Sequence, residues 1–186
     1  MLNYTVFRTQ WGHFAFAGVD DAVCRTFLPV ADRQAAERGL LLGLGPAAHA
    51  VRFDQGYLPE LQEQIVAYYE GEPVDFSVDP PAYIENISPF GRKVLLACRA
   101  IPFGVAKTYS DLARQIGSPL AARAVGSVMA ANPIPLIIPC HRILRTDGGL
   151  GGFSAPGGTA VKQRLLEHER SVRPRRCEVL LASPLT

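Results

Sequence analysis

Short apolar runs separated by polar and turn-forming residues occupy much of the first thirty positions, a pattern that predicts β-strands. Three short runs rich in aromatic and β-branched residues cover residues 4–7, 13–17 and 23–27. Glycines and an aspartate pair separate these runs, and such residues favour turns. Cys24 alternates with Arg25 inside the third run, so we expect it to lie in the core. Trp11 precedes a turn glycine and is expected to pack against apolar neighbours.

The apolar spacing then changes to three or four residues, which predicts helices. One helix is expected over residues 31–41, because glycines and a proline follow it. A second is expected over residues 58–70, where large apolar side chains recur at helical spacing. Several prolines follow between residues 72 and 87, and the residue before a proline avoids the helical region. This segment is therefore predicted to be an extended linker.

The second half opens with a clear helix start. Ser88 is a favourable N-cap residue, and Pro89 suits the first helical position. The helix that follows has one apolar face, which ends before Pro102. The side chains of that face, which we expect in the core, are Phe90, Val94, Leu95, Cys98 and Ile101.

Two further helices are short and joined by a tight turn. The first is predicted over residues 110–116 with Ser110 as its N-cap, and the second over residues 120–131. Gly117 ends the first helix, so the pair is typical of a helix-turn-helix DNA-binding unit. An ordinary helical hairpin fits the same pattern. Small residues crowd the second helix and Arg123 is its only charged residue, which lets its backbone approach a partner closely.

These elements divide the chain into four segments. We expect an N-terminal domain over residues 1–80, a linker over 81–87, a mostly helical domain over 88–170 and a basic tail over 171–186. The helical domain ends with a helix predicted over residues 159–170. The predicted fold class is therefore mixed α/β, of the α+β kind.

The composition is that of a soluble globular protein, with 48% hydrophobic and 19% charged residues. No apolar run approaches the ~20 residues that span a bilayer, so no membrane partner is expected. The N-terminus lacks the basic and apolar regions of a signal peptide. The four cysteines are scattered and form no CxxC pair, which argues against a disulfide framework and suits a reducing compartment. We therefore expect a cytoplasmic protein.

The net charge of +2 hides a strong asymmetry between the two halves. Residues 1–87 contain five basic and twelve acidic side chains, a net charge of −7. Residues 88–186 contain fourteen basic and five acidic side chains, a net charge of +9. Such a split suggests that the second half meets a polyanion. A solvated basic surface would give the same count.

A thiol, an imidazole and a guanidinium stand side by side at residues 140–142, inside an otherwise apolar run. Buried segments rarely contain such side chains unless these have partners or a task. Pro139 removes a backbone donor, so a regular central strand is not expected there. His141 and Arg142 are both expected to favour the thiolate form of Cys140. Cys140 is therefore a candidate nucleophile, although an isolated cysteine more often fills core space.

Several motifs around this run occur together and in order. With them the chain resembles the O6-alkylguanine-DNA alkyltransferases, also called methylated-DNA–protein-cysteine methyltransferases. The resemblance is strong over residues 85–170 and only general before them. The motifs are Tyr109-Ser110-Asp111-Leu112-Ala113, Ala122-Arg123-Ala124-Val125-Gly126, Asn132-Pro133, Ile138-Pro139-Cys140-His141-Arg142 and Leu165-Leu166-Glu167-His168-Glu169.

The resemblance implies an RNase H-like N-terminal domain and a C-terminal domain that performs both DNA binding and chemistry. Cys140 would accept the alkyl group, and His141 would take the thiol proton through a water molecule. Glu169 would orient the imidazole. An activated cysteine generally combines such a nucleophile, a base and a group that orients the base. Asn132 would hold the turn around Cys140. Tyr109 would relieve the charge on the departing guanine.

The resemblance also implies how DNA and the damaged base are held. The lesion lies inside a duplex, so the base must be flipped out to reach the thiol. Arg123 would enter from the minor-groove side and fill the vacated place, and a monomer would suffice. Residues expected to contact DNA with Arg123 are Ser110, Ala122, Ala124 and Gly126. Residues expected to line the guanine pocket are Tyr109, Met129, Leu150, Gly151, Phe153 and Ser154.

The sequence departs from the family pattern at one place and lacks one feature of some members. Ala155-Pro156 resembles a two-residue insertion in the glycine-rich loop. Some members bind structural zinc in the N-terminal domain, but His13, Cys24 and His49 do not form a convincing set of ligands here. We therefore expect no metal and no cofactor.

Three other functions were weighed against alkyl transfer. A module that only recognises alkylated guanine would lack the acceptor cysteine, whereas this chain has Cys140. A cysteine hydrolase is disfavoured because adjacent residues seldom form a nucleophile–base pair and no protease signature surrounds Cys140. A helix-turn-helix regulator would need more base-reading side chains than a single arginine.

Overall fold

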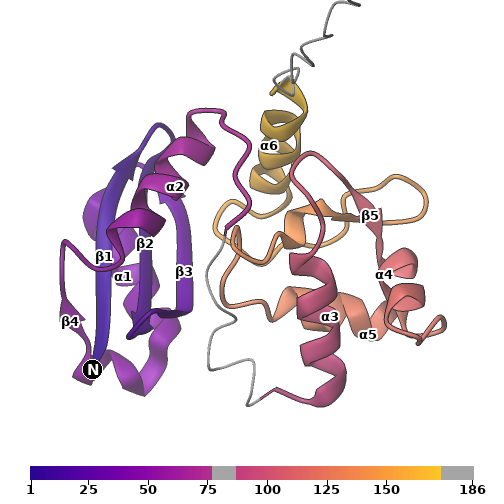
Figure 1. Ribbon diagram of the computed structural model, residues 1–186, viewed down its shortest axis with the longest axis horizontal. Coiled ribbons are helices and arrows are strands. Elements are labelled where there is room, and N and C mark those ends of the chain that lie inside the picture. The colour runs from indigo at the N-terminus through magenta and orange to yellow at the C-terminus, as the bar shows by residue number, and fades with distance from the viewer. Residues whose placement is uncertain (77–86, 173–186) are drawn as a thin grey trace, which may run out of the picture.

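The structure is a computed structural model that describes residues 1–76 and 87–172, and it forms two parts side by side (Figure 1). The first part is a sheet with helices and the second is mostly helical, so the mixed α/β fold class is confirmed. The predicted linker at residues 81–86 and the tail from residue 173 lie outside the described residues. Within the described ranges no helix is long and apolar enough to cross a bilayer.

The sheet of the first part confirms the strands expected over residues 4–7, 13–17 and 23–27. β1 (Leu2–Thr9), β2 (Gly12–Val19) and β3 (Ala22–Val30) form an antiparallel meander, and each is longer than the run that predicted it. The short β4 (Arg52–Phe53) pairs in parallel with β1. The strand order is β3-β2-β1-β4, so β3 lies at one edge.

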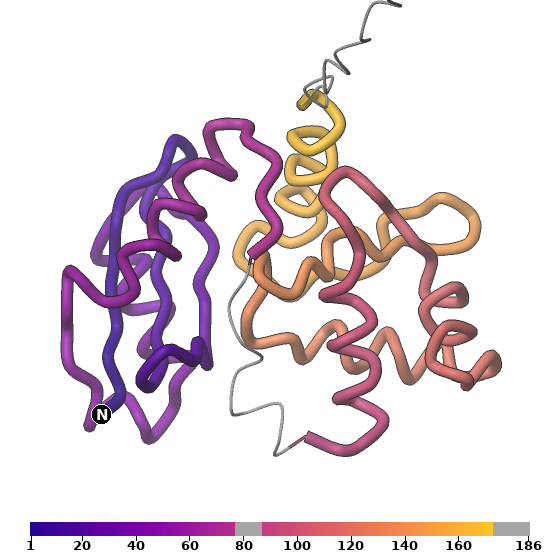
Figure 2. Tube along the Cα trace, in the orientation of Figure 1, coloured from indigo at the N-terminus to yellow at the C-terminus, as the bar shows by residue number. Residues whose placement is uncertain are grey.

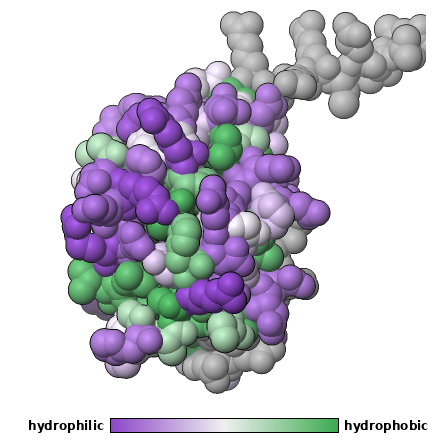
Figure 3. Space-filling model, turned by 90° about the vertical axis from the view of Figure 1, so that its left-hand side faces the viewer, coloured by the Kyte–Doolittle hydropathy of each residue, from purple (hydrophilic) through white to green (hydrophobic). Residues whose placement is uncertain are grey.

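Both faces of this sheet are buried, because successive side chains of a strand point to opposite faces. Ala15 and Ala17 of β2 pack with the helix α1 (Arg33–Leu44) on one face. Phe14 and Phe16 pack on the other face with the helix α2 (Pro59–Tyr69). A 3₁₀ segment, η1 (Gly45–Ala50), follows α1. The outward face of the first part mixes hydrophilic and apolar side chains (Figure 3).

Within residues 87–172, the second part contains four α-helices, a 3₁₀ segment and a small two-stranded ladder. Its helix α3 begins where the sequence predicted, with the hydroxyl of Ser88 accepting from the backbone N–H of Gly91. Cys98 is buried in the core as expected, whereas Cys24 in the first part is only half-buried. The elements are α3 (Pro89–Arg99), β5 (Lys107–Thr108), α4 (Tyr109–Gln115), α5 (Ala122–Ala130), η3 (Cys140–Arg142), β6 (Ile143–Leu144) and α6 (Gly158–Ser171).

Two predicted helix starts were wrong. α4 is capped by Thr108 instead of Ser110, because Thr108 and Asp111 form a reciprocal capping box. The Thr108 hydroxyl accepts from the backbone N–H of Asp111 (3.0 Å), and the Asp111 carboxylate accepts from the backbone N–H of Thr108 (2.9 Å). α5 starts at residue 122 instead of 120, which leaves Leu120 99% exposed in the turn between the two helices.

The edge strand β3 holds the two parts together. The backbone N–H of Thr26 donates to the carbonyl of Pro133 (3.0 Å), and the Thr26 hydroxyl donates to the carbonyl of Pro135 (2.8 Å). A loop of the second part thus covers a sheet edge that would otherwise present unpaired polar groups. In the tube drawing this edge faces the loops of the second part (Figure 2).

A second contact between the parts involves Trp11, which was expected to pack. Its ring lies 3.7 Å from the guanidinium carbon of Arg164 and 5.1 Å from the ring of His168, both on α6. Such cation–π contacts stabilise by about 0.5–2 kcal/mol. The first part therefore braces α6 as well as the loop that follows α5.

Replacing Thr108 by alanine is expected to destabilise the protein by about 1 kcal/mol, because the capping box is lost. Ser110→Ala is the matched control and should change the free energy of unfolding by only a few tenths of a kcal/mol. Urea unfolding of both variants measures the difference. A larger loss for Ser110→Ala than for Thr108→Ala would contradict the capping assignment.

Candidate active site

The backbone before Cys140 is folded tightly by local hydrogen bonds. The N–H of Ile138 donates to the carbonyl of Ile134 (3.0 Å), and the N–H of Cys140 donates to the carbonyl of Ile138 (2.8 Å). Pro139, with φ −80° and ψ 63°, has the geometry of an inverse γ-turn. Leu136 has a φ of 80°, which is rare for a leucine and costs about 1–3 kcal/mol. The prediction that this run is not a regular strand is correct.

The side-chain amide of Asn132 fixes this turn to the thiol. Its Nδ2 donates to the carbonyl of Ile138 (2.9 Å) and to Sγ of Cys140 (3.3 Å). Its Oδ1 accepts from the backbone N–H of Ile134 (3.2 Å). All of these atoms are buried, where an unpaired amide would be costly. Asn132 therefore sets both the shape of the turn and the position of the sulfur.

Cys140 is only 6% exposed, and burial raises the pKa of its thiol above the ordinary value. The hydrogen bond from Asn132, the charge of Lys162 and nearby backbone N–H groups act in the opposite direction. Burial disfavours the charged form and outweighs the pull towards thiolate that we expected from the neighbouring residues. The guanidinium of Arg142 is engaged with Glu169. The pKa shift of Cys140 therefore favours the protonated thiol.

His141 forms a buried hydrogen bond with Glu169, in which Nε2 and Oε1 are 2.8 Å apart. An ionised carboxylate only accepts, so Nε2 carries the proton and Nδ1 carries the free lone pair. Nδ1 is buried and has no hydrogen-bond partner among the described residues. Burial lowers the pKa of His141, although the bond to Glu169 opposes this shift. The imidazole is therefore neutral at pH 7 and can act as a base.

The carboxylate of Glu169 is the most densely hydrogen-bonded group of the site. Arg142 donates to it through Nε (3.0 Å to Oε2) and Nη2 (2.9 Å to Oε1). The backbone N–H of Gly104 donates to Oε2 (3.0 Å), and the Tyr68 hydroxyl to Oε1 (2.8 Å). Burial alone would raise the pKa of Glu169, but His141 and Arg142 together lower it to about 2. Glu169 is therefore ionised throughout the physiological range.

Lys162 is a buried cation that the sequence interpretation missed. Its Nζ donates to the carbonyl of Ile143 (2.6 Å) and lies 5.7 Å from the centre of the Tyr109 ring. Burial lowers the pKa of Lys162, and the nearby Cys140 opposes this shift. The sequence did contain a signal that Lys162 is buried. The i, i+3, i+4, i+7 spacing of one helix face is shared by Lys162, Leu165, Leu166 and Glu169.

Tyr109, the first residue of α4, lies between α5 and the glycine-rich loop. Gly151 has a φ of +68°, and a Cβ added there would come within 2.8 Å of the Tyr109 hydroxyl. Only glycine fits this close approach without strain. Burial raises the pKa of Tyr109, and Cys140 adds to the shift. The phenol therefore keeps its proton.

A cavity of about 640 Å³ opens beside Tyr109, between α5 and the glycine-rich loop. Most of the predicted site residues meet there or at an adjoining cavity of about 310 Å³, which Ser110 and Ala122 line. Ala124 is exposed on α5 and Met129 is buried on the same helix, and neither of them nor Leu150 lines the two cavities. The residues around the larger cavity are Tyr109, Arg123, Gly126, Ser127, Ala130, Arg145, Gly151, Gly152, Phe153 and Ser154.

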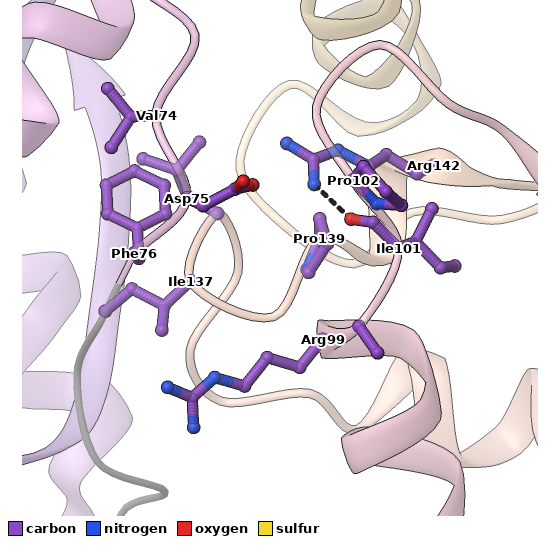
Figure 4. A pocket seen from close by; sticks show the side chains of 11 residues that line it. Val74, Asp75, Phe76, Arg99, Ile101, Pro102, Ile137, Pro139 and Arg142 are labelled. Atoms are coloured by element: carbon purple, nitrogen blue, oxygen red, sulfur yellow. Dashed lines mark hydrogen bonds between the residues drawn. The ribbon is translucent and has the colours of Figure 1, made fainter.

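A smaller pocket of about 190 Å³ lies behind the Cys140 turn, between the two parts of the molecule (Figure 4). The carboxylate of Asp75 points towards the guanidinium of Arg142, whose Nη1 donates to the carbonyl of Ile101 (2.6 Å). Arg142, which pairs with Glu169, lines this pocket, whereas Cys140 does not. No group of three or more His, Cys, Asp or Glu within residues 1–76 and 87–172 could hold a metal ion.

Comparisons with known proteins give a consistent picture. The family described as "6-O-methylguanine DNA methyltransferase, DNA binding domain" matches residues 89–171. A methylated-DNA–protein-cysteine methyltransferase of Mycolicibacterium paratuberculosis is 41% identical over 112 residues, which cover 60% of this chain and 65% of that protein. The constitutive enzyme of that name from Bacillus subtilis is 31% identical over 91% of this chain and 96% of its own length.

The fold is also similar to that of solved structures. The crystal structure of Mycobacterium tuberculosis OGT in complex with DNA superposes with a TM-score of 0.73 at 30% identity. The match covers 93% of this chain and 96% of that one. The similarity therefore includes the first part, where the sequence resemblance is only general.

Replacing Glu169 by glutamine is expected to destabilise the protein by about 3 kcal/mol at pH 7, because Arg142 loses its buried counter-charge. The stabilising effect of Glu169 is complete above its ordinary pKa of 4.5 and is lost as pH falls towards about 2. The difference between wild type and variant should therefore shrink below pH 4.5, as urea unfolding at several pH values would measure. Glu167→Gln, exposed on the same helix, is the control, and an equal loss there would argue against this account.

Proposed function

Because the chain belongs to the methylated-DNA–protein-cysteine methyltransferase family, we propose that it repairs DNA by transferring the alkyl group of O6-alkylguanine to its own Cys140. The observation that carries this proposal is the buried array of Cys140, His141 and Glu169, in which Asn132 donates to the sulfur. It combines a nucleophile, a base and a group that orients the base.

The reaction is a single displacement at the alkyl carbon. A water molecule relays the thiol proton to Nδ1 of His141, and the resulting thiolate attacks the carbon. The S–C bond forms as the C–O bond breaks, and guanine leaves with the electron pair. Lys162 and the Asn132 amide stabilise the thiolate while it exists. Tyr109 donates a proton or a hydrogen bond to the departing base, since its hydroxyl is protonated.

The product is a thioether, which is stable towards hydrolysis. None of the side chains described around Cys140 offers a second nucleophile suited to removing the alkyl group. One protein molecule therefore repairs one lesion and is then spent.

The damaged base has to leave the duplex, because Cys140 is 6% exposed and cannot reach into stacked DNA. Arg123 is exposed on α5 and lines both cavities beside Tyr109, which suits a side chain that fills the place of the extruded base. The small residues of α5, including Ala122, Ala124 and Gly126, suit approach to the minor groove, which is only ~6 Å wide. Phe153 and Ser154 are then beside the flipped guanine.

The proposal also assigns roles to the two parts of the molecule. α4 and α5, joined at Gly117, act as a helix-turn-helix within a domain over residues 88–170. The first part acts as an RNase H-like domain, which the strand order β3-β2-β1-β4 supports. The protein acts as a monomer on double-stranded DNA. A binding module without chemistry is not favoured, because Cys140 is present with its complete set of partners.

Incubation with a duplex that contains O6-methylguanine is expected to add one methyl group to the peptide that carries Cys140, at one per protein molecule. Mass spectrometry of the digested protein measures the net gain of one CH₂ unit, and Cys140→Ala is the control. An unmodified Cys140 peptide despite tight binding to the damaged duplex would refute alkyl transfer and support the binding-module alternative.

Arg123→Ala is expected to slow repair of duplex DNA by about tenfold or more, since base extrusion costs a few kcal/mol. Its reaction with free O6-benzylguanine should remain close to that of the wild type, because no base has to be extruded. Arg114→Ala, which removes an exposed arginine from α4, is the control. Equal slowing on both substrates would be inconsistent with the role given to Arg123.

A further inference from the structure

Tyr68 brings the first part of the molecule into contact with the reacting groups. It lies on α2 and is fully buried, and its hydroxyl donates to Oε1 of Glu169 (2.8 Å). Its backbone carbonyl accepts from Nε2 of His168 (2.6 Å), and its ring packs edge-on against Phe103. The phenol is therefore held rigidly by groups on both sides of the interface.

The oxygen that Tyr68 contacts is the one that His141 uses. Nε2 of His141 and the Tyr68 hydroxyl each lie 2.8 Å from Oε1, and Nη2 and Nε of Arg142 lie 2.9 Å and 3.1 Å from it. A carboxylate oxygen has two in-plane lone pairs, so these four donor atoms share more than its capacity. The direction and strength of the bond to His141 therefore depend on the donors from Tyr68 and Arg142.

We propose that Tyr68 is a positioning residue for alkyl transfer: its hydroxyl fixes Oε1 of Glu169 and limits the charge offered to His141, so that Nδ1 stays unprotonated and available. The first part of the molecule is then a component of the proton relay. This inference rests on the proposed function, because it assigns His141 the role of base.

The Tyr68 hydroxyl should change the pKa of His141 in a definite direction. A hydroxyl that donates to Oε1 withdraws negative charge from it, and less charge then stabilises the imidazolium form of His141. Removing the hydroxyl leaves more charge for His141, so the pKa of His141 rises. Burial and Glu169 raise the pKa of Tyr68 well above its usual value, so the phenol remains a donor throughout the working range.

The other charged and titratable groups around His141 and Glu169 do not change the direction of the expected pKa shift of His141. Arg142 and Lys162 are cations that lower the pKa of His141, and Glu169 is the anion that raises it. Neither cation is altered by removing the Tyr68 hydroxyl. The remaining neighbours are the thiols of Cys98 and Cys140, the ring of His168 against Tyr68, and Asp75, which faces Arg142 across the rear pocket (Figure 4).

Tyr69 provides a matched control. It adjoins Tyr68 on α2 and is equally buried, with its ring 5.2 Å from that of Tyr68. Its hydroxyl, however, has no hydrogen-bond partner among the described residues. Tyr69→Phe therefore removes the same atom from the same helix without touching Glu169.

The decisive measurement is an NMR titration of the His141 imidazole, which does not depend on repair activity. In Tyr68→Phe the pKa of His141 is expected to be about one unit higher than in the wild type. In Tyr69→Phe it should not move. An unchanged pKa in Tyr68→Phe, or an equal shift in both variants, would overturn the proposal.

The rate of alkyl transfer against pH provides the second readout. Tyr68→Phe should shift the acidic side of the pH–rate profile upwards by about one pH unit. The variant should then transfer the alkyl group about tenfold more slowly than the wild type at acidic pH, and at the same rate at alkaline pH. A uniform loss at all pH values would show a merely structural role and overturn the proposal. Absence of transfer by the wild type, with the NMR shift present, would instead refute the proposed function.

Site-specific incorporation of a fluorinated tyrosine at position 68 keeps the test open if Tyr68→Phe does not fold. Fluorination makes the phenol a stronger donor with almost no change in shape. The pKa of His141 should then fall below its wild-type value, opposite to the effect of phenylalanine. A rise or no change would contradict the proposed role of Tyr68.

Discussion

The structure depends on one buried carboxylate, that of Glu169. Moving an ionised carboxylate from water into a protein interior costs several kcal/mol unless donors surround it. The donors here come from distant segments, namely α2, the loop after α3, and the turn that carries His141 and Arg142. These donors together stabilise the charge. Packing of the two parts and formation of the site around Glu169 therefore support each other.

Periodic patterns predicted the helices and strands well, because each records which side of one segment is buried. Local chemistry was harder to interpret where two candidates competed. Thr108 and Ser110 both suit an N-cap, but Asp111 stands three residues after Thr108, whereas Ala113 stands three after Ser110. Only the first pair can form a reciprocal capping box. The signal for the correct helix start was therefore present in the sequence.

The sequence predicted individual residues of the candidate site only where those residues belong to a recognisable motif. Asn132, Cys140, His141 and Glu169 lie in contact as the resemblance implied. Lys162 could have been found from the spacing of its helix. Tyr68 could not, because it contacts Glu169 across 101 positions of sequence and no local pattern records that contact. The direction of the Cys140 pKa shift was also missed, because it depends on how deeply tertiary packing buries the sulfur.

The protonated state of Cys140 affects how long the protein stays competent. A thiol reacts far more slowly than a thiolate with peroxides, disulfides and other small electrophiles. Burial raises the pKa of Cys140 and also keeps such solutes away from the sulfur. Under the proposed function, in which each molecule accepts one alkyl group, burial thereby conserves the thiol for that single reaction.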